Sequence, residues 1–195
     1  SLNLTNSILV YYFLSIYQMS WNFGAPNLTS IKNLVAKEGT TLEEVLNDSN
    51  LAPSLRYETE EVIDFLSIKN NIKNLLIWSI TTSYDDNPDF LKYSRLSTSV
   101  LIFPCIQLQN AIIDSNLLLT AFRNFFRLSP EDCPLICGNY QKVFKYFIKV
   151  THGEILEQFP EIFSYLIDRI QVLPLRLLLF DILIESNEYI SDIEP

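Results

Sequence analysis

The chain has 195 residues, with 14 Lys and Arg against 23 Asp and Glu, so its formal net charge is −9, and 48% of it is apolar. This length corresponds to one domain or one segment of a repeat array. The acidic balance argues against a nucleic-acid partner, because nucleic-acid affinity depends on Lys and Arg that neutralise phosphates.

Leu and Ile together contribute 52 residues, whereas Val contributes 8 and Gly 4. This composition favours Leu-rich helices over β-branched strands and tight hairpin turns. No segment shows convincing strand alternation or a hairpin dipeptide. The sequence therefore predicts an all-α protein.

Residues 8–17 (ILVYYFLSIY) form an uncharged, largely apolar run near the N-terminus. A membrane-spanning helix needs about 20 such residues, and no basic residue precedes the run as in a secretory signal. We therefore expect no stable membrane insertion. The run is either an N-terminal helix or a non-native extension before a true start at Met19, so we divide the chain into 1–18 and a helical domain over 19–195.

The expected helices follow one another closely along the chain. The first begins near Asn27 and ends at Gly39, which suits the residue after a helix. Thr41-Leu-Glu-Glu44 matches a capping box, in which the Thr and Glu side chains accept from each other's backbone amides. Pro53 suits the first turn of a helix that runs to about Ser67. Further helices are expected over 72–80, 90–103, 106–113 and 116–127, around 143–147, and from Thr151, Pro160 and Pro174.

These patterns make about nine or ten short helices. Helical pairs of this length predict an α-solenoid of stacked pairs, of the armadillo or HEAT kind. Thr151-His-Gly-Glu154 matches a second capping box. The last helix, over 174–185, is apolar around nearly its whole circumference, so we expect neighbours on most of its sides and further repeats beyond this chain.

Cys133, Cys137 and His152 form the cluster that most resembles a metal site. A structural zinc site needs four ligands at tight spacings, and no fourth ligand is nearby in sequence. Cys137 and His152 also lack the sequence context of a nucleophile and its base. We expect no metal, no cofactor and no catalytic residue. Together with Cys105, the odd number of cysteines matches no disulfide framework and indicates a reducing, intracellular compartment.

Three pairs of adjacent carboxylates have structural interpretations. Glu43-Glu44 suits a helix start, where the dipole favours negative charge. Glu60-Glu61 is typical of a solvated helix face, and Asp85-Asp86 of a loop tip that contacts either solvent or a basic partner. The aromatic residues of the C-terminal half are expected in the core, namely Phe122, Phe125, Phe126, Tyr140, Phe144, Tyr146 and Phe147.

Five residues are the candidates for contacting a partner. Trp21 and Phe23 precede the first helix and either fold back onto it or anchor a partner. Arg56 is either a surface residue or a docking contact. Asp85 and Asp86 complete the set.

Several short segments carry a resemblance to a known family. They are Trp21-Asn-Phe23, Thr41-Leu-Glu-Glu-Val-Leu46, Asp48, Arg56 and Val62-Ile-Asp-Phe-Leu66, followed by weaker similarity from Pro134 to Val143 and from Ile155 to Leu166. In this order the chain resembles the N-terminal part of SAPS-domain proteins. These are regulatory subunits of the type-2A-like serine/threonine phosphatase called protein phosphatase six.

The resemblance implies a helical-repeat subunit without catalysis of its own. Such a subunit binds the phosphatase catalytic subunit, has ankyrin-repeat partners in some lineages, and directs the enzyme to substrates in cell-cycle and nutrient signalling. It implies a cytoplasmic protein, with the nucleus as a further compartment. Two alternatives stay open: an unrelated armadillo-type adaptor in transport or membrane traffic, and a helical enzyme whose site joins Cys137, His152 and a carboxylate.

Overall fold

The computed structural model describes residues 27–81, 89–127 and 134–191, with side chains described as far as residue 184. This part of the chain forms twelve α-helices and one π-helical segment, with no strand. The all-α expectation is therefore confirmed, with more helices than the nine or ten expected. The N-terminal extension over residues 1–18 and Met19 lie outside the described residues.

The described helices of the first half of the chain are all short, and the three longest helices lie in the second half. The first half contains α2 (Thr29–Ala36), α3 (Leu42–Asn47), α4 (Leu51–Arg56), α5 (Glu60–Ser67), α6 (Lys69–Leu76) and the π-helical η1 (Ile77–Thr81). The second half contains α7 (Phe90–Leu101), α8 (Ile106–Asp114), α9 (Leu117–Phe125), α10 (Pro134–Val150), α11 (Glu154–Gln158), α12 (Ile162–Asp168) and α13 (Leu173–Ser191).

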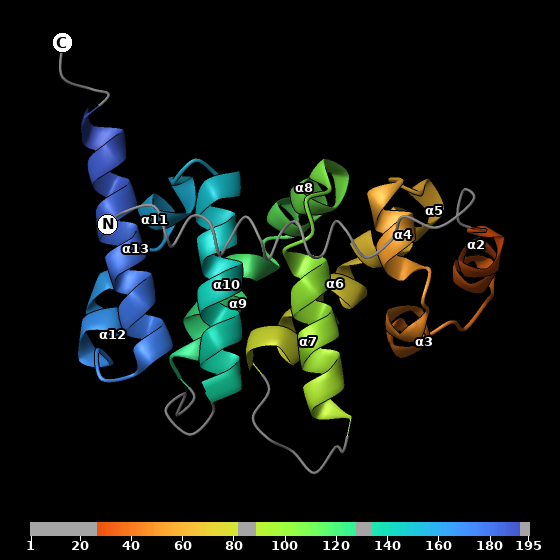
Figure 1. The fold of residues 1–195 in the computed structure, drawn as a ribbon, viewed down its shortest axis with the longest axis horizontal. Coiled ribbons are helices and arrows are strands. Elements are labelled where there is room, and N and C mark those ends of the chain that lie inside the picture. Colours follow the sequence, from red (N-terminus) through yellow and green to blue (C-terminus); the bar gives the residue numbers. More distant parts are fainter. Residues whose placement is uncertain (1–26, 82–88, 128–133, 192–195) are drawn as a thin grey trace, which may run out of the picture.

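The chain runs from one end of an elongated molecule to the other (Figure 1). Helices α2 and α3 lie at one end, and α12 and α13 at the other. The three longest helices, α7, α10 and α13, lie side by side, because α10 contacts both of the others. The last helix therefore has α10 and α12 as its main neighbours on one side.

The start of α3 shows local sequence and structure in agreement. The Glu44 amide donates to Thr41 Oγ1 at 3.2 Å, and the Thr41 amide donates to Glu44 Oε2 at 2.9 Å. These two bonds satisfy amides that have no partner within the helix. Gly39 precedes them at φ +82°, a conformation that costs glycine little. The expected capping box is confirmed, whereas the first helix ends at Ala36, three residues before Gly39, with Lys37 as its extended C-cap.

The helix expected from Pro53 to about Ser67 is wrong, because it is two helices, α4 and α5. The break lies at Glu58, whose φ is +49°. The Thr59 amide donates to the Ser54 carbonyl at 2.9 Å, which closes the end of α4, and Thr59 then begins α5 in an extended conformation. The apolar spacing continues across this left-handed residue, so periodicity alone does not reveal the break.

The second expected capping box, at Thr151-His-Gly-Glu154, is also wrong. The Thr151 hydroxyl donates to the Phe147 carbonyl at 2.7 Å, within the last turn of α10. His152 and Gly153 follow at φ +49° and +89° and reverse the chain. In a capping box the Glu is the third residue of the helix. Glu154 is instead the first residue of α11, so it cannot form one with Thr151.

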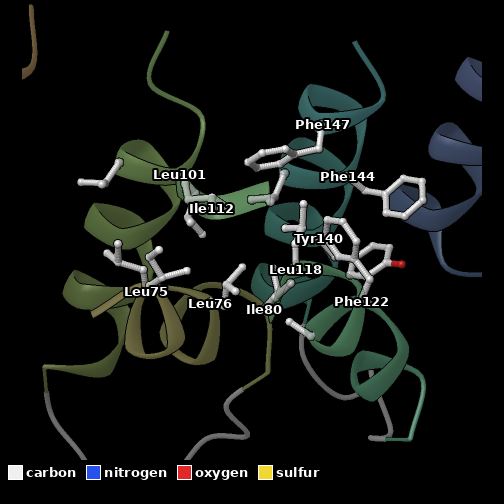
Figure 2. Close-up of a cluster of buried hydrophobic side chains, with 14 of the residues drawn as sticks. Leu75, Leu76, Ile80, Leu101, Ile112, Leu118, Phe122, Tyr140, Phe144 and Phe147 are labelled. Carbon is white, nitrogen blue, oxygen red and sulfur yellow. The ribbon is translucent and has the colours of Figure 1, made fainter. Parts of the chain in front are cut away.

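The aromatic cluster lies in the core as expected. Figure 2 shows side chains from α6 through α10 converging on one apolar interior. The Phe125 and Tyr140 rings stack with centroids 4.0 Å apart, and Phe122 meets Phe144 edge to face at 4.7 Å. Tyr146 is the exception, because it is half-buried and its hydroxyl donates to the Phe103 carbonyl at 3.0 Å.

A buried polar network joins η1, α7 and α10. Asn139 Nδ2 donates to the Ser79 carbonyl at 3.1 Å and to Ser94 Oγ at 2.8 Å. Ser79 Oγ and Thr98 Oγ1 are 2.7 Å apart, and Thr98 in turn donates to the Ser94 carbonyl. The π-helical turn leaves carbonyls without regular helical partners, and Asn139 supplies one of them with a donor.

Candidate protein-interaction surface

The clearest functional feature of the described surface is an apolar face on α13. Leu173, Leu177, Phe180 and Ile184 are 53%, 44%, 50% and 61% exposed. Their spacing of four, three and four residues places them on one side of the helix. We call these four residues the α13 face. Scattered exposed apolar residues are normal on proteins, but a continuous row of them marks a contact surface.

The opposite side of α13 is buried. Leu175, Leu178, Leu179 and Ile182 are between 0% and 6% exposed and belong to the main core. They pack where α13 meets α10 and α12. The expectation that this helix has neighbours on most sides is therefore wrong for the described part of the chain, in which one side is buried and the other is open.

An ion pair connects α13 with α10. Lys145 Nζ lies 2.9 Å from Asp181 Oδ2, and both side chains are about one-third exposed (35% and 30%). Such a pair contributes little to stability on its own, because water screens it. The orientation of the α13 face away from the core therefore follows mainly from the buried row and not from this pair.

Of the five predicted partner-binding residues, the structure describes one. Trp21, Phe23, Asp85 and Asp86 lie outside the described residues. Arg56 is exposed in the last turn of α4 and forms no ion pair with another described residue. Because α4 lies toward the other end of the molecule from α13 (Figure 1), the structure does not bring Arg56 to the α13 face.

The proposed Cys-His pair is not a site. Cys137 is buried near the start of α10, and His152 is exposed in the turn after its end. At 1.5 Å per residue the two positions are separated by about 20 Å along the helix axis. Cys133 lies outside the described residues. Within the described residues, no group of three or more His, Cys, Asp and Glu is arranged to hold a metal ion.

The two described carboxylate pairs act locally at helix starts. Glu44 belongs to the capping box, and Glu60 and Glu61 lie exposed in the first turn of α5. Glu61 Oε1 accepts from Lys32 Nζ at 3.1 Å. The backbone amide near Glu61, and then Lys32, lower the pKa of this carboxyl below its usual value. Glu44 and Glu61 are therefore engaged in structural contacts.

One hollow of about 270 Å³ lies between α8, α9 and α11. Asp114 and Glu154 line it, and both are exposed, so water solvates their charges. Ile113, Leu118 and Ile155 form its apolar floor. It lacks the buried, convergent polar groups that define a small-molecule site.

Sequence reasoning missed the α13 face, although its signal is visible. The run from Leu173 to Ile184 is apolar around nearly the whole helix circumference, which predicts that the helix packs against other elements but not which of its sides is buried. Which side meets the core depends on where α10 and α12 lie. The structure therefore shows which residues of this largely apolar helix are buried and which are exposed.

Within the described residues, no single helix has the length and hydropathy to cross a membrane, and only α7 and α8 reach that threshold as a pair, bent by 104° at their junction. Comparison of the chain with protein-family models, with curated proteins and with solved structures gives no match. The resemblance to SAPS-domain proteins therefore stays a prediction from the sequence.

Proposed function

We propose that this protein is a non-catalytic interaction subunit that binds a type-2A-like serine/threonine phosphatase catalytic subunit through the α13 face. The observation that carries the proposal is the exposed row of Leu173, Leu177, Phe180 and Ile184 on an otherwise well-packed helical protein. Burying a large apolar side chain stabilises a complex by about 1.5–3 kcal/mol when it is fully removed from water. Four such residues in one row are an adequate centre for a protein interface.

The order of the helices supports an α-solenoid as the scaffold for this surface. Contacts connect α2 with α5, α5 with α8, α7 with α10, and α10 with α13, so elements pack against others a few positions along the chain. In a solenoid each unit buries its apolar side on the next, which is the pattern that these contacts follow.

Two parts of this proposal rest on the resemblance to SAPS-domain proteins. They are the identity of the partner as a phosphatase and the lack of catalysis by this chain. As a regulatory subunit the protein directs the enzyme to substrates in cell-cycle or nutrient signalling, with an ankyrin-repeat subunit as a further partner. For this role we propose a location in the cytoplasm, with the nucleus as a second compartment.

Affinity purification of the full chain from cells, followed by mass spectrometry, tests this function. Three baits are compared: the unchanged chain, the double variant Leu177→Glu with Phe180→Glu, and the control Ile106→Glu. Ile106 is 69% exposed on α8, so its change places the same charge on a different surface. Circular dichroism checks that all three baits retain their helices.

We expect the unchanged chain and the Ile106 control to recover a type-2A-like catalytic subunit, and the double variant to lose it. Failure of all three folded baits to recover that enzyme would overturn the phosphatase assignment. Recovery of it by all three would overturn the use of the α13 face. Recovery of an unrelated transport or traffic protein in its place would favour the armadillo-type adaptor.

A further inference from the structure

We draw no further inference here: the strongest candidate, the exposed apolar α13 face, belongs to the surface already described, and nothing in the structure shows what covers it.

Discussion

Helices α10 and α13 are neighbours of similar length, 17 and 19 residues, but they differ in how much of their surface is buried. Helix α10 contacts η1 and α7 as well as α13, and eight of its residues are buried. Helix α13 buries one row and exposes another. The comparison teaches that two long, Leu- and Ile-containing helices can differ in exposure because α10 has described neighbours on several sides, whereas α13 packs mainly against α10 and α12.

The largest expected difference between the two helices concerns their aromatic residues. Phe144→Ala in α10 removes a ring that is fully buried against Phe122 and Tyr140, so we expect a loss of about 3–5 kcal/mol in the free energy of unfolding. Phe180→Ala on the α13 face removes a ring that is half exposed, and should cost less than about 1 kcal/mol. Urea denaturation followed by circular dichroism measures both. Similar losses would mean that α13 is as deeply packed as α10.

The next largest change in stability is expected at Asn139, the buried polar residue of α10. Asn139→Ala leaves the Ser79 carbonyl and Ser94 hydroxyl without their donor, which should cost about 1–3 kcal/mol in the free energy of unfolding. Lys142→Ala on the exposed side of α10 is the matched control and should change stability by less than about 0.5 kcal/mol. The same denaturation series measures both variants. Equal stability of both variants would contradict a structural role for the network.

A change at Tyr140 in α10 should alter the free energy of unfolding by a smaller amount, and this change should depend on pH. Its hydroxyl is buried and makes no hydrogen bond to another described residue, and desolvation raises its pKa well above the usual value. Tyr140→Phe should therefore stabilise the protein by about 1 kcal/mol.

The sign of the pH effect follows from linkage. Because the folded-state pKa is raised, the associated stability is present below the unfolded pKa, about 10, and is lost as pH rises further. Thermal unfolding scans at increasing alkaline pH should show a steeper loss for the unchanged protein than for Tyr140→Phe. Parallel curves would show that Tyr140 does not govern alkaline unfolding.

The ion pair between the two helices gives the smallest effect. Lys145→Ala should cost about 0.2–1 kcal/mol in the free energy of unfolding, and less at high salt, because the pair with Asp181 is partly exposed. A double-mutant cycle with Asp181→Ala isolates the interaction energy. A coupling well above this range that salt does not reduce would indicate that α13 is held in place mainly by this pair.

Much of the local structure could be predicted from residue patterns. The Thr41 capping box and the burial of Phe122, Tyr140 and Phe144 depend on spacing and neighbours in sequence, and all are confirmed. The first helix ends at Ala36, a few residues before the expected end at Gly39. The break at Glu58 could not be predicted, because a non-glycine residue at positive φ leaves no mark in the apolar pattern. The break after α10 was expected near Thr151, but the positive φ of His152, which rules out the capping box there, was not.

The candidate site was least accessible to sequence reasoning. Of the predicted partner contacts only Arg56 is described, and it lies away from the α13 face. Residue order alone established that residues 173–184 are apolar around nearly the whole helix circumference, because that pattern can be read without knowing the neighbouring helices. Only the tertiary structure decided that Leu178 is buried and Phe180 exposed, since that choice depends on where α10 and α12 pack.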